Sequence, residues 1–186
     1  MRAGVLAAAI AAPLLGGCSA RDSYVSAAVA TPAGNWRIER AVDPITRAPL
    51  SSALLTTRAS SNSAVPFPRP AMLQLTCFKG EPLVRFSFEF KVGSGRNSVL
   101  GYSFDETPGR ETNARFLQDY KTAVIEDKAE VAPFVKELAA AKVLHVRIRS
   151  LNAGRTTAEY HLDGARAAIE AAFVECPLSG ARRAQQ

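Results

Sequence analysis

The chain has 186 residues, of which 47% are hydrophobic and 22% are charged, and its formal net charge is +6. This length predicts a single domain, and the composition excludes an intrinsically disordered chain. A mildly basic protein can bind anionic lipids, polysaccharides or nucleic acids. The sequence has no basic run interleaved with aromatic residues, and the export signal at its N-terminus also argues against nucleic acid, so we expect no nucleic-acid partner.

The N-terminal segment has the layout of a secretory signal. Arg2 supplies a positive charge, residues 5–15 are apolar, and the motif Leu-Gly-Gly-Cys ends the segment at Cys18. This ending resembles the lipobox of bacterial lipoproteins, in which the cysteine is acylated and becomes the mature N-terminus. The resemblance implies a signal peptide over residues 1–17 and lipidation of Cys18. The alternative is an ordinary signal peptide that is cut near Ala20.

The residue after Cys18 bears on which membrane would hold the anchor. Ser19 stands there, in place of the aspartate that resembles an inner-membrane retention signal. We therefore expect a periplasm-facing protein anchored to the bacterial outer membrane, with the inner membrane as the alternative. A residue that carries more than one acyl chain would hold the protein stably on the bilayer.

Two further cysteines, Cys77 and Cys176, would remain after lipidation of Cys18. An even pair in an oxidising compartment is typical of a disulfide. Such a bridge would close a loop of about 100 residues, for which chain entropy gives an upper figure of about 4–5 kcal/mol. Two buried free thiols are the alternative interpretation.

A hairpin from Leu73 to Lys91 is predicted at the centre of the domain. Strict alternation of apolar and polar residues indicates two strands with one buried face each. A connection of four residues, which includes Gly80 and Pro82, joins them. The residues expected on the buried face are Leu73, Leu75, Cys77, Val84, Phe86, Phe88 and Phe90.

The other elements follow from alternation and from turn residues. Strands are expected at Trp36 to Val42, Leu50 to Arg58, Ser98 to Phe104, Thr122 to Glu126, Val143 to Arg149 and Thr156 to Leu162. Residues 59–70 and 105–113 are expected to be loops. One helix is expected from Glu130, with Pro133 near its start, and a second from an N-cap at Asp163 to Cys176.

These elements show no βαβ alternation, so we expect an α+β fold that is mainly antiparallel β. The expected architecture is a β-sandwich or a strongly bent sheet of seven to eight strands with two helices, the C-terminal one tethered to the sheet by the disulfide. Residues 18–34 are expected to form a lipidated N-terminus and flexible tether, residues 35–179 a single periplasmic domain, and residues 180–186 a disordered tail.

Short motifs spread over the mature chain carry a family resemblance. They are Trp36 with Asp43-Pro44-Ile45-Thr46, Leu75-Thr76-Cys77, Tyr102-Ser103-Phe104-Asp105, Phe134 to Leu138 before Leu144-His145-Val146-Arg147, and Tyr160-His161-Leu162-Asp163-Gly164 leading to Cys176. Together they resemble the TagO/VasI group of periplasmic proteins associated with type VI secretion and related exported domains. In that family an arginine usually occupies the position of Ser103. The resemblance implies an accessory role in the cell envelope and implies no chemistry.

Both histidines, His145 and His161, fall on the outward phase of two strands that we expect to pair. A two-histidine metal site would also need a carboxylate or a thiolate, and Glu159 is the nearest outward candidate. A metal-dependent enzyme or a hydrolase acting on envelope polymers could use these residues. The alternative is two surface histidines, and because no ligand spacing accompanies them we expect no metal and no cofactor.

Other catalytic patterns are missing from the sequence. It has no Gly-x-Ser-x-Gly elbow, and the loop at residues 93–95 lacks the Lys-Ser/Thr ending of a phosphate loop. Two carboxylate pairs, Asp105-Glu106 and Glu126-Asp127, fall in polar segments, where we expect solvated loop charges. We therefore expect no catalytic residues and a protein that is not an enzyme.

A basic strip remains as a candidate binding site. His145, Arg147 and Arg149 project from one strand face, and Arg155 lies in the adjoining turn. Such a strip could contact an acidic protein, a lipid headgroup or a glycan, although a solvated sheet face with long side chains is the alternative. We thus expect a non-catalytic, membrane-anchored periplasmic lipoprotein that serves as a binding or accessory module of a cell-envelope system, possible partners being an envelope protein or an anionic polymer.

Overall fold

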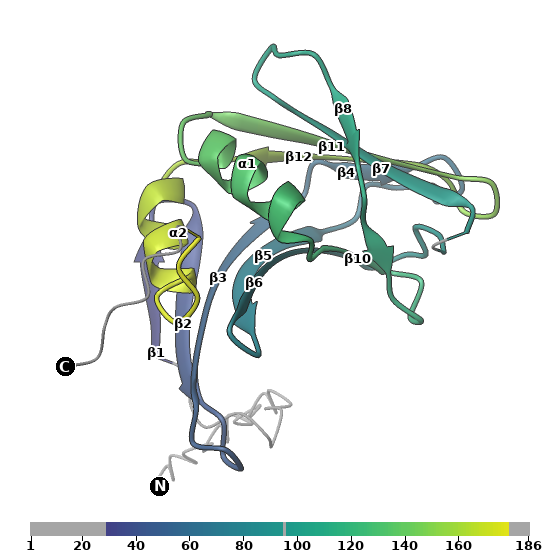
Figure 1. The fold of residues 1–186 in the computed structure, drawn as a ribbon. Helices are drawn as coiled ribbons and strands as arrows, with labels where there is room; N and C mark the ends of the chain where they lie inside the picture. The colour runs from purple at the N-terminus through teal and green to yellow at the C-terminus, as the bar shows by residue number, and fades with distance from the viewer. Residues whose placement is uncertain (1–28, 95, 179–186) are drawn as a thin grey trace, which may run out of the picture.

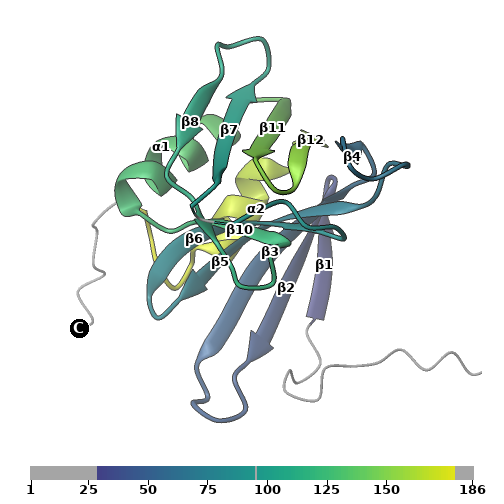
Figure 2. The same cartoon turned by 90° about the vertical axis from the view of Figure 1, so that its right-hand side faces the viewer.

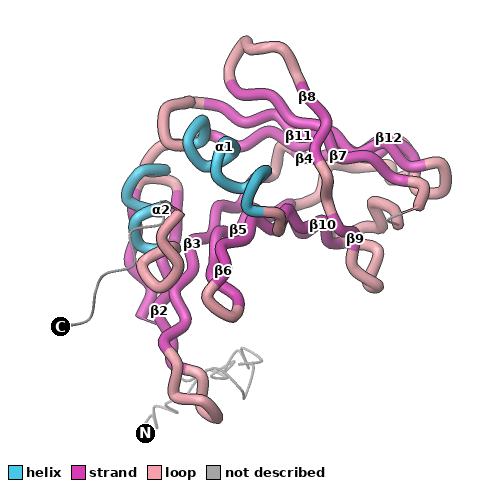
Figure 3. Tube along the Cα trace, in the orientation of Figure 1, coloured by secondary structure: helices cyan, strands magenta, loops and turns pink. Residues whose placement is uncertain are grey.

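A computed structural model describes residues 29–94 and 96–178 of the chain. In this part of the chain the strands form two antiparallel sheets, of seven and five strands, and two helices accompany them (Figures 1 and 3). The predicted α+β class with mainly antiparallel strands is confirmed. The predicted number of strands is too low, since the described residues contain twelve. The predicted signal peptide, Cys18 and the tail at residues 180–186 lie outside the described residues.

The seven-stranded sheet has the strand order β1-β2-β3-β5-β6-β10-β9. These strands are β1 (Val29–Ala33), β2 (Trp36–Val42), β3 (Pro49–Thr57), β5 (Ala71–Phe78), β6 (Glu81–Phe88), β10 (Thr122–Ile125) and β9 (Arg115–Phe116). The five-stranded sheet has the order β4-β12-β11-β7-β8. Its strands are β4 (Ser60–Asn62), β12 (Gly154–His161), β11 (Val143–Ser150), β7 (Ser98–Phe104) and β8 (Arg110–Thr112). Figure 1 shows the seven-stranded sheet curving beneath the five-stranded one.

The central hairpin, formed by β5 and β6, has the predicted buried face but a tighter turn than predicted. Only Lys79 and Gly80 separate the strands, and both have positive φ, at 53° and 78°. Such a two-residue turn matches the right-handed twist of the flanking strands, and glycine adopts its second position without steric cost. Glu81 and Pro82, predicted to belong to the connection, are therefore the first residues of β6.

The predicted tether ends earlier than residue 34, because Val29–Ala33 forms the edge strand β1. It pairs antiparallel with β2, from Val29 opposite Arg40 to Ala33 opposite Trp36. Pro32 is compatible with this position, since an edge strand leaves one row of backbone groups without a partner strand. The segment has no apolar alternation, so backbone pairing rather than side-chain burial forms the strand. Hydrophobic periodicity could not have found it.

Three short strands lie in segments that were predicted to be irregular or were left unassigned. β4 lies in the predicted loop over residues 59–70, β8 lies in the predicted loop over residues 105–113, and β9 precedes β10. Each has only two or three residues and pairs with one strand, β4 with β12, β8 with β7 and β9 with β10. Segments this short contain too few positions for a period of two to be recognised.

Helix α1 (Lys128–Leu138) begins before the predicted start at Glu130. Asp127 is its N-cap, and its carboxylate accepts a hydrogen bond from the backbone N–H of Ala129. Capping by aspartate satisfies one of the free N–H groups at a helix start. Pro133 consequently lies in the interior of the helix rather than in its first turn. In the interior of a helix a proline removes one backbone hydrogen bond.

Helix α2 (Ala165–Ala172) is shorter than the predicted helix and has a different N-cap. Gly164, with φ of 88°, occupies the cap position in place of Asp163, and no side chain caps the helix. A Cβ at Gly164 would lie 2.0 Å from the backbone oxygen of Ala33, and one at Gly34 would lie 2.4 Å from that of Asp163. The β1–β2 turn therefore packs directly on the start of α2. Neither described helix is long and apolar enough to cross a bilayer.

Helix α1 lies between the two sheets (Figure 1). Its residue Phe134 contacts aromatic residues of both sheets. The buried ring of Phe134 packs edge-on against Phe86 of β6, at 6.1 Å between centroids. On the other side it lies 4.9 Å from the ring of Tyr102 and 5.3 Å from that of Phe104, both in β7. Edge-to-face aromatic contacts of this kind add to the free energy gained from burial. The core thus spans both sheets and the helix.

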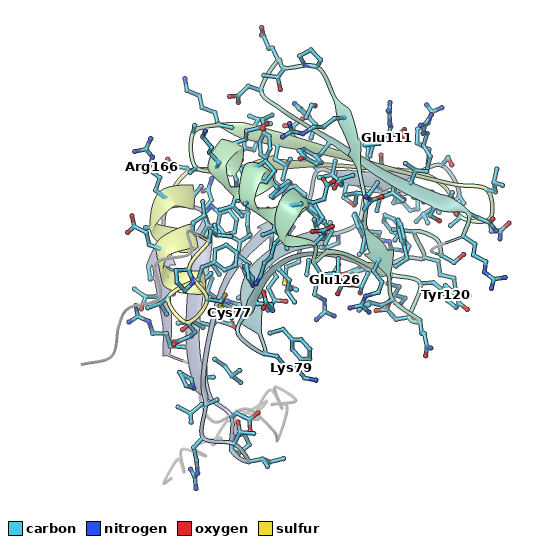
Figure 4. The ribbon with its side chains drawn as sticks, in the orientation of Figure 1. Cys77, Lys79, Glu111, Tyr120, Glu126 and Arg166 are labelled. Carbon is cyan, nitrogen blue, oxygen red and sulfur yellow. A yellow bond between two sulfur atoms is a disulfide. The ribbon has the colours of Figure 1, made fainter. Side chains whose placement is uncertain are left out.

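The predicted disulfide between Cys77 and Cys176 is present, with 6.0 Å between the two Cα atoms. Cys77 is near the end of β5, and Cys176 follows the last turn of α2. Figure 4 shows the bridge beside the C-terminal helix. The bridge therefore fastens the end of the described chain to the central hairpin, as predicted.

Replacing both bridged cysteines, as Cys77→Ser with Cys176→Ser, should lower the free energy of unfolding by about 2–4 kcal/mol, since the closed loop is long. Chemical denaturation with and without reductant measures this effect. The wild type should lose stability in reductant, whereas the double variant should not respond. An unchanged wild-type transition in reductant would contradict the bridge.

Two core tyrosines differ in how their hydroxyl groups are satisfied. The Oη of Tyr102 accepts a hydrogen bond of 2.8 Å from Nε of Arg110. The Oη of Tyr160, which is fully buried, has no hydrogen-bond partner among the described residues. A buried hydroxyl without a partner loses its hydration and gains nothing in return. Burial accordingly raises the pKa of Tyr160 far above its ordinary value.

This difference predicts that replacing tyrosine by phenylalanine changes the free energy of unfolding differently at the two positions. Tyr160→Phe removes an unsatisfied hydroxyl and should leave the free energy of unfolding unchanged or raise it by up to about 1 kcal/mol. Tyr102→Phe removes the acceptor of Arg110 and should lower it by about 1–2 kcal/mol. Urea denaturation of the two variants side by side compares them. Destabilisation of Tyr160→Phe as large as that of Tyr102→Phe would show that the Tyr160 hydroxyl has a partner.

Candidate functional site

The basic strip lies on the outer face of the five-stranded sheet, the face turned away from α1. His145, Arg147 and Arg149 project from β11, and all three are exposed. Arg155, near the start of β12, stands directly opposite Arg149. The structure therefore brings the four predicted residues together on one surface, because alternation and the β11–β12 register put their side chains on the same side.

Two of these side chains are engaged with acidic neighbours. Arg149 forms an ion pair with Glu111 of β8, and Nδ1 of His145 lies 3.7 Å from a carboxylate oxygen of Glu159 on β12. The guanidinium groups of Arg147 and Arg155 have no ion-pair partner within residues 29–94 and 96–178. Since exposed ion pairs are weak, the face keeps a positive character centred on Arg147.

An open hollow of about 840 Å³ lies over the middle of this face, around Arg147. Gly101 of β7 stands opposite Arg147 on one side, and Thr157 of β12 stands opposite it on the other. Because Gly101 has no side chain, the sheet surface is lowered beside the guanidinium. The hydroxyl groups of Ser103 and Thr157 add hydrogen-bonding atoms to the lining. A guanidinium above a polar floor is suited to binding carboxylate or phosphate groups.

The sequence did not single out Gly101, Glu111 and Thr157, the residues that shape this hollow. Gly101 and Glu111 belong to β7 and β8, which become neighbours of β11 only through long-range pairing. Thr157 lies on the outward phase of β12, where the alternation was visible. Its hydroxyl is held by a hydrogen bond of 2.9 Å to Ser61 of β4. A strand as short as β4 or β8 gives no signal in the sequence.

The two histidines flank one carboxylate, as the metal-site hypothesis requires. Glu159 lies 3.4 Å from Nε2 of His161 and 3.7 Å from Nδ1 of His145, through different oxygens. Even so, no group of three or more His, Cys, Asp or Glu residues in the described parts of the chain is arranged to hold a metal ion. The contacts are those of exposed ion pairs between imidazole and carboxylate, which form when the histidines are protonated.

A row of three polar residues crosses adjacent strands and consists of Ser103, His145 and Glu159. Their residue types are those of a nucleophile, a base and an acid that orients the base. No hydrogen bond links the Ser103 hydroxyl to His145, and the distance from His145 to Glu159 exceeds that of a hydrogen bond. The row lies in the middle of a paired sheet, whose backbone N–H groups are used in the ladder. They are therefore not free to form an oxyanion hole.

Three of the four carboxylates in the two pairs have structural roles, which the prediction of solvated loop charges did not include. Asp105 accepts hydrogen bonds of 3.0 and 2.9 Å from the backbone N–H groups of Lys142 and Val143. Glu126 binds Arg115 through both carboxylate oxygens, at 2.6 Å each, and these bonds lower the pKa of Glu126. Asp127 is the N-cap of α1. Glu106 is exposed like the other three, but its carboxylate has no hydrogen bond or ion pair within the described part of the chain.

Comparison with protein-family models, with curated proteins and with solved structures finds no match to this chain. The resemblance to the TagO/VasI group therefore stays a prediction that rests on the motifs alone.

The neighbouring carboxylates Asp105 and Glu106 provide a matched test of these roles. Asp105→Ala removes the acceptor for two backbone N–H groups at the start of β11 and should lower the free energy of unfolding by about 1–2 kcal/mol. Asp105→Asn, which keeps an acceptor and tolerates the positive φ of 48° at this position, should cost less. Glu106→Ala should have no effect beyond about 0.5 kcal/mol. Thermal denaturation compares the three variants, and equal losses for Asp105→Ala and Glu106→Ala would contradict the assignment.

Proposed function

We propose that this chain is a non-catalytic periplasmic lipoprotein, anchored by Cys18 to the outer membrane, that acts as a binding or accessory module of a cell-envelope system. Its binding surface is the outer face of the five-stranded sheet, and its partner carries carboxylate or phosphate groups, on an envelope protein or an anionic polymer. A role connected with secretion agrees with the resemblance to the TagO/VasI group.

The observation that carries this proposal is the free guanidinium of Arg147 beside the floor at Gly101. Most of the other long charged side chains on this face have an acidic or basic neighbour that satisfies them. A charged group left without a partner in a hollow lined by hydroxyl groups is available for a charge-assisted hydrogen bond with a ligand. The hollow is open to one side, which suits a polymer or a protein surface better than a small molecule that must be enclosed.

The absence of catalysis in this proposal has its own physical support. The row of Ser103, His145 and Glu159 lacks the hydrogen bonds by which a base activates a nucleophile. It also lies on an exposed face, where water screens charges and weakens electrostatic stabilisation of a transition state. Binding through many weak contacts tolerates such exposure, whereas catalysis benefits from a site that excludes water.

The proposal is tested by cross-linking in intact cells, with charge reversal at one residue of the face. Arg147→Glu should reduce recovery of the cross-linked partner at least about tenfold, because it replaces a charge-assisted contact by repulsion. Lys136→Glu, the same charge change at an exposed position of α1, is the matched control and should behave as the wild type. Cys18→Ala should move the protein out of the membrane fraction.

Two outcomes would contradict different parts of the proposal. Partner recovery that is equal in Arg147→Glu and Lys136→Glu would exclude the outer face as the binding surface. In high-salt washes, which weaken charge-dependent membrane contacts, membrane association of Cys18→Ala equal to that of the wild type would exclude the lipid anchor.

A further inference from the structure

The chain enters the domain at the end of the seven-stranded sheet where two hairpin turns also lie. Val29, the first described residue, pairs with Arg40 near the end of β2. The β2–β3 turn over residues 43–48 follows directly. The β5–β6 turn at Lys79 and Gly80 lies at this same end, since β5 runs antiparallel to β3. Cys18 precedes Val29 by a segment that spans at most about 35–40 Å when fully extended.

Large apolar side chains are exposed at these turns. Ile45 in the β2–β3 turn is 83% exposed, and Phe78 at the start of the β5–β6 turn is 60% exposed. Leu50, at the start of β3, is also exposed and lies beside the end of β5 that carries Phe78. Single exposed apolar residues need no explanation, but here three of them lie at one end of the molecule.

Basic side chains accompany these apolar residues. Arg47 follows Ile45 in the β2–β3 turn, and Nζ of Lys79 lies over the ring of Phe78, 5.5 Å from its centroid. Arg40 is exposed nearby, and none of the three cations has an ion-pair partner in the described ranges. Apolar side chains flanked by lysine and arginine are typical of surfaces that enter the headgroup region of an anionic bilayer.

The β2–β3 turn also contains an acidic side chain, that of Asp43, but its negative charge is engaged by the turn itself. Its carboxylate accepts hydrogen bonds of 2.9 and 2.8 Å from the backbone N–H groups of Thr46 and Ile45. These bonds lower the pKa of Asp43 and fix the turn that presents Ile45.

Three other acids lie nearby. Glu81 forms an ion pair of 2.6 Å with Lys128, and Glu39 forms one of 2.9 Å with Arg37. Glu175 accepts a hydrogen bond of 3.4 Å from the hydroxyl group of Ser51, the residue opposite Arg40. All four acids are thus engaged within the domain.

We infer that this end of the seven-stranded sheet is a bilayer-contacting surface, in which Ile45, Leu50 and Phe78 enter the interface of an anionic membrane and Arg40, Arg47 and Lys79 contact its phosphates. The inference rests on the proposed function, because the lipid anchor at Cys18 is what keeps the domain within reach of the membrane. It adds a second attachment, by the domain itself, that fixes how the domain stands on the bilayer. Figure 4 shows Lys79 at this end and Glu111 far from it, on the outer face of the five-stranded sheet.

Depth-dependent quenching tests the inference in the lipidated protein, reconstituted in vesicles of phosphatidylethanolamine and phosphatidylglycerol with brominated acyl chains. Phe78→Trp places a reporter in the proposed contact, and Phe67→Trp places one at a similarly exposed aromatic position in the loop before β5, at the opposite end of that strand. The native Trp36 is buried and contributes the same background to both. Emission from Phe78→Trp should be quenched about twofold or more relative to Phe67→Trp.

A charge variant and a flotation assay complete the experiment. Adding Arg47→Glu and Lys79→Glu to Phe78→Trp should abolish the extra quenching, and omitting phosphatidylglycerol should weaken it. Equal quenching at the two positions would overturn the inference, as would cross-linking of the Phe78 position to a protein in place of lipid. Flotation of the wild type but not of Cys18→Ala would show that the lipid on Cys18 binds the protein to the vesicles. Failure of the bilayer contact by the domain can therefore be distinguished from failure of the proposed function.

Discussion

The fold depends on the aromatic cluster around Phe134. The ring of this residue contacts Phe86 in the seven-stranded sheet and both Tyr102 and Phe104 in the five-stranded sheet. Two sheets that pack face to face would leave little room for a helix, so the seven-stranded sheet curves away where α1 enters (Figures 1 and 2). Because the cluster includes all three layers, the loss of one ring would loosen contacts in both sheets at once.

A second set of constraints closes the molecule at the other helix. The close approach of Gly34 to Asp163, and of Gly164 to Ala33, fits the β1–β2 turn against the start of α2. The disulfide fixes the segment after α2 to the end of β5. Both ends of α2 are therefore held, one by backbone contact and the other by a covalent bond. This explains how a helix of eight residues, too short to be stable alone, is ordered in the fold.

Two of the surfaces that these constraints leave exposed have positions that suit the proposed function. The inner faces of both sheets are used in the core, so the outer face of the five-stranded sheet remains available for binding. The turns that carry Ile45 and Phe78 lie at the end where the chain enters the domain. If that end rests on a bilayer, as proposed, the hollow around Arg147 is held away from the membrane surface and is open to the surrounding solvent. An anchored module that displays its binding face in this way can reach a partner without leaving the membrane.

The sequence by itself determined the faces of the long strands, the disulfide pair and the side of β11 on which the basic strip lies. Each of these follows from local alternation or from cysteine number, which do not depend on distant contacts. Only the tertiary structure decided that β1, β4 and β8 are strands, since backbone pairing with a partner far along the chain forms them. It also decided which cations are free. Glu111 forms an ion pair with Arg149 because β8 pairs with β7, whereas Arg147 faces Gly101 and has no ion-pair partner among the described residues.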